Sequence, residues 1–217
     1  MQSKQGFRCE GLLILIGGML LILAVVMHPP LVDPYNGVKA LHGYRHAAMW
    51  MWDHIVMLLA MVLWLLGLIG SCLALPNDRS AAMSRQVFTV PLGLWILILC
   101  AELTALPILG RYAVQTNQAV AKIIWAAIFS FVLLAGYLAM ACCWLGVILC
   151  SYAMKQNAGS GFPLYFSRLG LASGILGVLG IVLTCCFFNA GYILLPLTMG
   201  PPYLWTLWFG WKLISHH

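Results

Sequence analysis

The residues of this chain that could do chemistry are histidines and acids set beside long apolar runs. His28 ends one such run, and Asp53 and His54 begin a second. Glu102 lies late in a third. Imidazole and carboxylate ligands suit zinc, iron or manganese, and two histidines with one carboxylate suit iron(II) in particular. A charged side chain within hydrocarbon costs at least about 2.5–3.5 kcal/mol, so His28, His54 and Glu102 predict a metal site.

Two further histidines, His42 and His46, are spaced for binding a single ion. In a helix they lie at i and i+4, where their rings project from adjacent turns. The same helical face continues through Met49, Asp53 and Met57. We therefore expect His42 and His46 as additional ligands, on a helical segment that leads into the second apolar run.

The remaining histidine of the second run, His54, is rotated by about a quarter turn from that face. We expect it to point to His28 or Glu102. A haem iron takes one or two axial imidazoles, and His28 or His54 facing His46 would supply them. Methionine thioethers near these histidines favour copper(I). The predicted cofactor is a metal ion (iron, copper or zinc) or haem b. The predicted metal ligands are His28, His54, Glu102, His42 and His46, and the predicted haem ligands are His28, His46 and His54.

The composition shows what must hold these residues in place. The chain has 217 residues, of which 63% are hydrophobic and 7% charged, whereas a soluble domain has roughly 45–50% and about 25%. So few charges cannot cover a water-soluble globule, and the sequence predicts an integral membrane protein in contact with the lipid bilayer. The formal charge of +6 does not indicate a nucleic-acid partner, because the bases are scattered singly between apolar runs.

Apolar runs of about 20 residues, each long enough for one bilayer crossing, divide the chain into six predicted transmembrane helices. The interruptions between them are polar or rich in proline and glycine, which stop helices. The longest connection, 28–50, is expected to be an outer interfacial segment. Residues 1–217 are thus predicted to form a single all-α transmembrane domain, a polytopic helix bundle. The expected spans are 11–27, 51–75, 87–109, 121–151, 168–188 and 192–213.

The distribution of lysine and arginine predicts the orientation. With six spans both termini lie on one side of the membrane, and that side carries seven of the eleven bases. An excess of bases marks cytoplasmic segments, so we expect cytoplasmic termini in a bacterial inner (plasma) membrane and histidines near the outer face. His216 and His217 are interpreted as a terminal tail or a tag remnant.

Short motifs in the first half of the chain carry a resemblance. Met27-His28-Pro29-Pro30 closes the first predicted span, a histidine opens the second, and the stretch from Glu102 to Pro107 reads Glu-Leu-Thr-Ala-Leu-Pro. This pattern resembles a loose group of bacterial six-span integral membrane proteins. The resemblance implies a six-helix bundle and no particular activity.

A further pattern concerns helix packing. The predicted fifth span carries a series of small residues at helical spacing, which allows neighbouring helices to approach closely. We expect this face to pack within the bundle, with homodimerisation as the alternative. The series is Gly170, Ser173, Gly174, Gly177 and Gly180.

From these observations we predict a membrane protein whose outer His/Glu site binds a metal ion or haem for redox chemistry or metal handling. As an enzyme it would be a metal- or haem-dependent membrane oxidoreductase acting on a quinone or another lipid-soluble small molecule. One alternative is a proton-coupled small-solute transporter, in which Glu102 titrates as a solute passes the proline-rich break of the last span. Another is a non-catalytic subunit or assembly factor of a membrane complex with partner subunits. For Glu102 itself the structural alternative is a protonated side chain hydrogen-bonded to a carbonyl, Ser130 or Tyr137.

Overall fold

The computed structural model describes residues 7–29, 32–46, 48–75, 79–116, 118–156 and 161–215, with only the backbone of Arg45 and His46. Within these ranges the chain is helical and contains no strand, which confirms the predicted all-α class. Two short 3₁₀ turns, Cys72–Ala74 and Phe188–Ala190, follow α3 and α7. The helices are α1 (Arg8–Met27), α2 (Gly37–His46), α3 (Trp50–Ser71), α4 (Arg79–Leu103), α5 (Ala105–Thr116), α6 (Ala119–Gln156), α7 (Leu164–Cys186) and α8 (Gly191–Ser215).

Among the described residues, five helical stretches are long and apolar enough to cross a membrane. They are α1, α3 with its 3₁₀ turn, α4 together with α5, α6 and α7. The C-terminal helix α8 is not among these five, although it has 25 residues, and it contains Pro196, Pro201 and Pro202. Five long apolar helices indicate a membrane protein, as the composition predicts.

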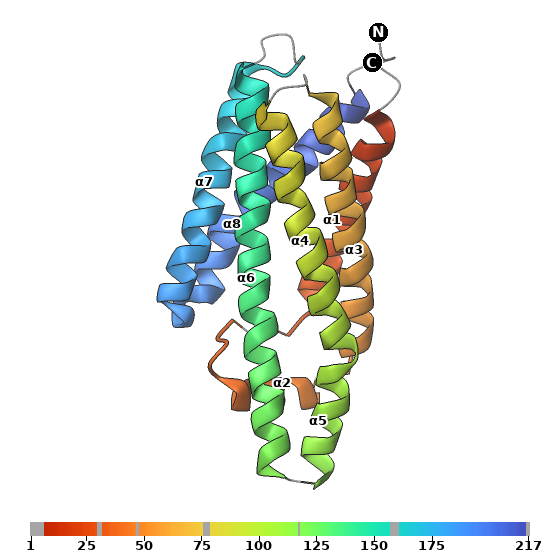
Figure 1. Ribbon diagram of the computed structural model, residues 1–217, viewed down its shortest axis with the longest axis vertical. Coiled ribbons are helices and arrows are strands. Elements are labelled where there is room, and N and C mark those ends of the chain that lie inside the picture. Colours follow the sequence, from red (N-terminus) through yellow and green to blue (C-terminus); the bar gives the residue numbers. More distant parts are fainter. Residues whose placement is uncertain are drawn as a thin grey trace.

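The helices differ in length, and this difference shapes the molecule. The α4–α5 stretch and α6 each span 38 residues, about 57 Å at a rise of 1.5 Å per residue. The other long helices have 20 to 25 residues. Figure 1 shows the extra length of α5 and α6 projecting from one end of the bundle, with α2 lying crosswise beside it; both described termini lie at the opposite end. We call these the α2 end and the terminal end.

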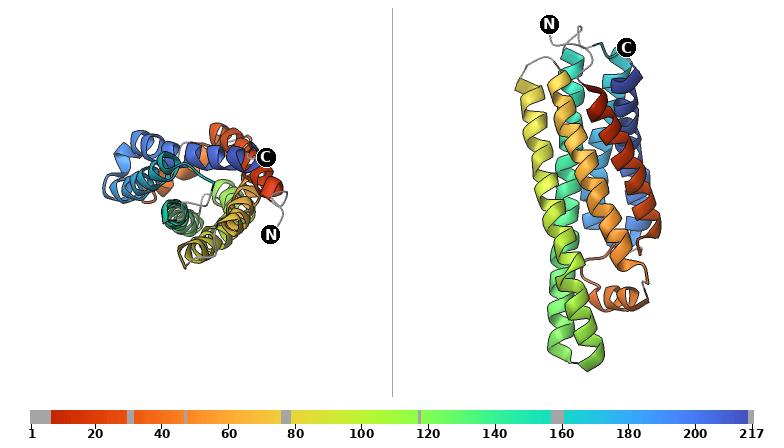
Figure 2. Two further views of the ribbon diagram at one scale, coloured as in Figure 1. Left: turned by 90° about the horizontal axis from the view of Figure 1, so that it is seen from above. Right: turned by 90° about the vertical axis from the view of Figure 1, so that its right-hand side faces the viewer.

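The side view in Figure 2 shows the same arrangement, with α2 beneath the ends of the shorter helices. The helices that contain the predicted spans 87–109 and 121–151 extend beyond them. α4 begins at Arg79 and tolerates Pro91 within it, and α6 continues to Gln156. The predicted interfacial segment 28–50 contains α2, as expected for a helix and a turn.

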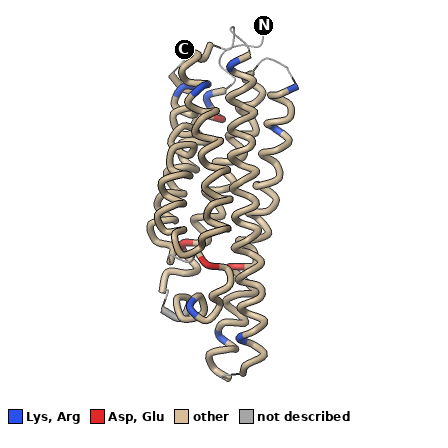
Figure 3. The backbone as a smooth tube through the Cα atoms, turned by 90° about the vertical axis from the view of Figure 1, so that its left-hand side faces the viewer, with Lys and Arg blue, Asp and Glu red and all other residues tan. Residues whose placement is uncertain are grey.

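Charged residues are distributed unevenly along the bundle. Figure 3 shows the described lysines and arginines near both ends, whereas most of the acids lie in one layer at the level where the shorter helices end, toward the α2 end. Because acids are costly in an apolar environment, this layer is where a functional site is expected.

Close packing between helices depends on glycine at specific positions. A Cβ atom on Gly17 of α1 would overlap the backbone nitrogen of Trp64 and lie 2.8 Å from the carbonyl oxygen of Ala60 on α3. On α7, a Cβ on Gly177 would lie 2.7 Å from the indole of Trp144. The small-residue face of α7 is thus occupied by packing within the chain, against α6 and α8.

Candidate metal site

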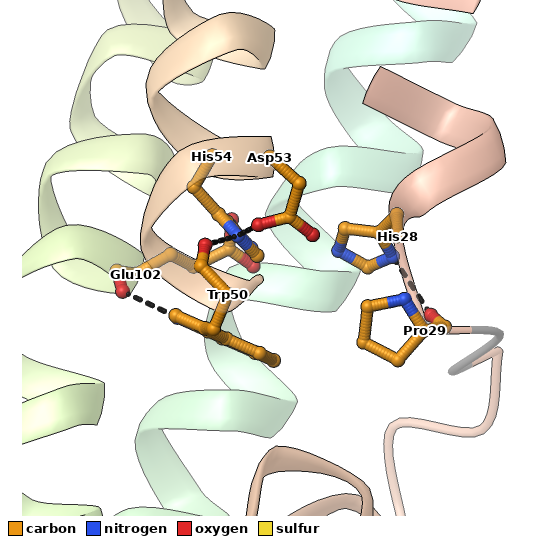
Figure 4. A network of polar contacts seen from close by, with 6 residues as sticks. All are labelled: His28, Pro29, Trp50, Asp53, His54 and Glu102. Carbon is orange, nitrogen blue, oxygen red and sulfur yellow. Dashed lines mark hydrogen bonds and ion pairs between the residues drawn. The ribbon is translucent and has the colours of Figure 1, made fainter. Parts of the chain in front are cut away.

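Three helix ends deliver the polar residues of the acidic layer to one place (Figure 4). His28 directly follows α1 in an extended conformation, because Pro29 cannot continue the helix. Asp53 and His54 lie in the first turns of α3, and Glu102 lies in the last turn of α4. Asp53 and His54 are completely buried, so their hydrogen-bonding groups must be satisfied within the protein or by a bound species.

The ring of His54 contacts an acceptor at each nitrogen. Its Nδ1 lies 2.6 Å from the carbonyl oxygen of Trp50 and 2.6 Å from Oδ1 of Asp53. A carbonyl oxygen only accepts, so Nδ1 carries a proton and donates. In the neutral ring Nε2 then holds a lone pair, yet it lies 3.2 Å from Oε2 of Glu102 and makes no hydrogen bond. Two acceptors facing each other in this way require a proton or a metal ion between them.

The ring of His28 is oriented in a similar manner. Its Nδ1 donates to the carbonyl oxygen of Pro29 at 2.7 Å, which leaves Nε2 as the acceptor. Figure 4 shows the other side of this ring facing Asp53 and His54. Burial lowers the pKa of His28. His28 is therefore neutral at pH 7, which is the form that binds metal ions.

The carboxylate of Asp53 completes a group of three ligands. Its Oδ2 is buried and has no hydrogen-bond partner, and in Figure 4 a carboxylate oxygen points toward His28. One ligand atom from each of His28, Asp53 and His54 lies within 4.8 Å of the other two. A tetrahedral ion bound at ~2.1 Å needs ligand atoms about 3.4 Å apart, so the three ligand atoms would have to move closer together to hold an ion. The hydrogen bond from His28 to Pro29 is of the kind that orients metal-binding histidines.

An aromatic side chain fixes the position of both His54 and Glu102. The indole of Trp50 stacks on the His54 ring, with centroids 4.3 Å apart and planes 23° apart. Its Nε1 donates to the backbone carbonyl of Glu102 at 2.9 Å. Trp50 thereby connects α3 to the end of α4.

The carbonyls around the break between α4 and α5 are satisfied by donors from other helices. Pro107 has no N–H and cannot donate to Leu103, so the helix is weakened here. Trp125 of α6 donates to the Leu106 carbonyl at 3.0 Å, and Tyr44 of α2 donates to the Pro107 carbonyl at 3.2 Å. Burial raises the pKa of Tyr44, which keeps its hydroxyl protonated. These contacts fix the helix end that carries Glu102.

Replacing Trp50 by phenylalanine is expected to keep an aromatic ring over His54 but to remove the donor to Glu102. The part-buried carbonyl of Glu102 then loses this partner, and we expect the free energy of unfolding to fall by about 1 kcal/mol. Denaturant unfolding of the detergent-solubilised protein measures this. Trp52→Phe is the control, since Trp52 is 63% exposed, and it should change stability by less than about 0.5 kcal/mol. Equal effects of the two substitutions would contradict the role of Trp50.

The structure brings together three of the residues predicted from the sequence and leaves the others apart. His28, His54 and Glu102 meet, with the His28 and His54 rings 5.0 Å apart. His42 is exposed on α2 and does not belong to the group of three. The side chain of His46 lies outside the described residues, as do His216 and His217.

The expected continuous face from His42 through Asp53 is wrong. α2 ends at His46 and α3 begins at Trp50, so the two helices do not share one register. The alternative partners of Glu102 are also engaged elsewhere. The Ser130 hydroxyl donates to the Pro34 and Ala126 carbonyls, and the Tyr137 hydroxyl donates to the Val32 carbonyl at 2.5 Å.

Sequence reasoning did not include Asp53 among the metal ligands. The incorrect register placed it on a different face from His54, with His42. The signal that could have identified it is a carboxylate directly before a histidine in the first turns of an apolar helix, where both side chains are costly to bury. Comparisons of the chain with protein-family models, with curated proteins and with solved structures found no match. The resemblance to bacterial six-span proteins therefore stays a prediction.

Proposed function

We propose that this protein binds one transition-metal ion through His28, Asp53 and His54, with Glu102 beside it, for redox chemistry or metal handling. The observation that supports this most directly is the unpaired state of the buried acceptors. Oδ2 of Asp53 and Nε2 of His54 are buried without a hydrogen bond, and Nε2 faces a carboxylate at 3.2 Å. A cation at this place would satisfy atoms that otherwise remain unpaired at considerable cost.

The donor set favours a bare ion over haem. Two imidazoles and one carboxylate are typical of iron(II) sites with open positions. Adding the Glu102 carboxylate as a fourth ligand would suit zinc. A haem iron requires a ring nitrogen directed at it. In His54, Nδ1 donates to the Trp50 carbonyl, so Nε2 is the atom free to bind, and it faces the Glu102 carboxylate, which could serve as another ligand of a bare ion. We therefore favour iron(II), with an open position for a small lipid-soluble substrate such as a quinone.

We further propose that α8 is a sixth crossing, that the termini are cytoplasmic and that the metal site faces the outer side of the inner membrane. Both described termini lie at one end of the bundle in Figure 1, as an even number of crossings requires. α8 packs along α1 and α7 through its 25 residues. The greater number of bases at the terminal end favours the cytoplasmic side.

Elemental analysis of the purified full chain tests the proposal. After gentle detergent extraction and loading with iron(II) or zinc, we expect about one ion per chain. Asp53→Asn removes the carboxylate that both histidines face, and we expect the affinity to fall by at least about 100-fold, the upper range found for losing a second-shell partner. Asp33→Asn is the control, because Asp33 accepts from the backbone of Tyr35 and is not in the group of three. A wild-type chain that retains none of these ions would refute the proposal.

A proton relay is the second candidate, favoured by one specific contact. His54 lies between two carboxylates, 2.6 Å from Asp53 and 3.2 Å from Glu102. The Glu102 side chain is 13% exposed while that of Asp53 is 1% exposed, so a proton arriving at Glu102 could pass through the ring of His54. This arrangement suits a proton-coupled transporter.

In proteoliposomes that contain a pH-sensitive dye, this relay predicts proton entry driven by a pH gradient. Glu102→Gln keeps the shape of the side chain but cannot titrate, and we expect the rate to fall at least tenfold, to the level of empty liposomes. Glu10→Gln is the control, since Glu10 lies in the first turn of α1 at the terminal end. If the wild-type rate equals that of empty liposomes, the relay is excluded and the metal site is unaffected.

A further inference from the structure

A second group of polar side chains lies at the terminal end of the bundle, where three elements meet. Cys72 is in the 3₁₀ turn after α3, Ser84 is on α4 and Cys150 is on α6. Their exposed fractions are 4%, 0% and 1%. All three are buried, and none of them contributes to the group around His54.

The contacts of these side chains bring two thiols together. The Cys72 thiol lies 3.5 Å from the Ser84 hydroxyl and 3.3 Å from the Leu68 carbonyl. It lies beside the thiol of Cys150, which follows Gly146 by one turn of α6. Ser84 donates its own proton to the Gly146 carbonyl at 2.9 Å, so the oxygen of Ser84 presents a lone pair to Cys72. Two sulfur atoms, from α6 and from the 3₁₀ turn after α3, thus lie together in the buried core.

Two adjacent sulfur ligands in an apolar enclosure suit a soft cation. Thiolates and thioethers select copper(I) over harder ions. Binding would replace the two S–H protons by one copper(I), release both protons and leave a complex with one negative charge, without any change of oxidation state. Met154 follows Cys150 by four residues, so it lies on the same face of α6, and it is 2% exposed. Its thioether is a third soft donor within one helical turn.

The surrounding charge matches this complex. Arg85 directly follows Ser84 in the sequence, and Figure 3 shows further bases at this end of the bundle. A positively charged end stabilises a complex that carries one negative charge. At the α2 end, by contrast, the acids of the histidine site favour a divalent ion.

We propose that Cys72 and Cys150 form a binding site for copper(I), separate from the histidine site. Cys72 follows His54 by eighteen residues along one helical stretch, which corresponds to ~27 Å, so the two sites do not share an ion. The proposal goes beyond the proposed function and does not depend on it. It gives the bundle a soft-metal site at the terminal end and a hard-donor site at the α2 end.

The test uses the full chain in detergent under reducing conditions, with copper(I) titrated against a chromophoric copper(I) chelator. To remove competing thiols, the background variant carries serine at four exposed cysteines, and it carries His54→Ala to disable the histidine site. We expect one copper(I) per chain in this background. Cys72→Ser with Cys150→Ser should weaken binding by at least about 100-fold. The exposed cysteines are Cys9, Cys100, Cys185 and Cys186.

The matched control is the variant with Cys142→Ser and Cys143→Ser on α6. Cys143 is as buried as Cys150 but is not part of the pair, so this variant should bind copper(I) as tightly as the background does. Equal affinity of the Cys72/Cys150 variant and the background would overturn the proposal, and so would a background that binds no copper(I).

Helix content by circular dichroism shows whether each variant folds. If the Cys72/Cys150 variant does not fold, the site is tested by X-ray absorption of copper(I) bound to the Cys142/Cys143 variant, which counts the sulfur atoms around copper. In that variant only Cys72 and Cys150 can supply thiolates. Two or three sulfur neighbours around copper support the site, and fewer than two exclude it. If the cysteine site binds no copper(I), a protein that keeps His54 should still bind one ion at the histidine site. The two proposals can therefore fail independently.

Discussion

Replacing His54 by alanine is expected to eliminate metal binding and to destabilise the bundle. His54 is the residue that contacts every other member of the site, so its loss removes one ligand and leaves the Asp53 carboxylate buried without a partner. Breaking a buried ion pair by removing one side costs about 3–5 kcal/mol. We expect the metal content to fall from about one ion per chain to background and the free energy of unfolding to fall by about 3 kcal/mol.

Elemental analysis and denaturant unfolding in detergent measure the two effects, and a double variant separates them. Adding Asp53→Asn to His54→Ala removes the buried charge, so stability should partly return while metal binding does not. His42→Ala is the control, because His42 is exposed on α2 and outside the group of three. A His54→Ala protein that retains stoichiometric metal would contradict the assigned ligand set.

The second large effect is expected from a single methyl group between α1 and α3. In Gly17→Ala the new Cβ meets the backbone nitrogen of Trp64 and the carbonyl of Ala60. These are backbone atoms, so no side-chain rotation can relieve the overlap and the helices must separate. Overpacking of this kind costs about 1–3 kcal/mol. Because α1 holds His28 against α3, we expect metal affinity to fall together with stability.

Gly93→Ala provides the matched control on α4. A Cβ at Gly93 meets nothing within 4 Å, and alanine is favoured over glycine in a helix by about 0.8–1 kcal/mol. This variant should be as stable as the wild type or more stable. Unfolding of both variants in the same detergent gives the comparison, and a Gly17→Ala protein as stable as Gly93→Ala would show that α1 and α3 do not pack as described.

Much of the fold was predictable because the length of apolar runs and the position of prolines are local properties. The end of α1 at Met27 follows from Pro29, and the predicted start of the second span lies one residue from that of α3. The lengths of α4 to α6 were not predictable in the same way. α5 runs through Pro107, and donors from α2 and α6 satisfy the carbonyls around it, which is a tertiary effect.

The sequence could predict at which end of the bundle the candidate site lies, but not which residues form it. Topology alone brings His28, His54 and Glu102 to one end of the bundle. Whether Asp53 joins them depends on the residue at which α3 begins. That residue is Trp50, which is buried and bonded to the carbonyl of Glu102, far away in the sequence. Helical periodicity extrapolated from His42 could not detect this, because the helix is interrupted before Trp50.

The unequal helix lengths have a consequence for the membrane that surrounds the protein. α1 has 20 residues, about 30 Å and equal to the hydrocarbon thickness of a typical bilayer. If the hydrocarbon core matches α1 in length, the boundary between lipid tails and headgroups falls at the depth of the histidine site, because His28 lies at the very end of α1. A thicker host bilayer would keep water away from His28 and Glu102, and a thinner one would admit it. Lipid chain length should therefore tune how strongly the bound ion is held.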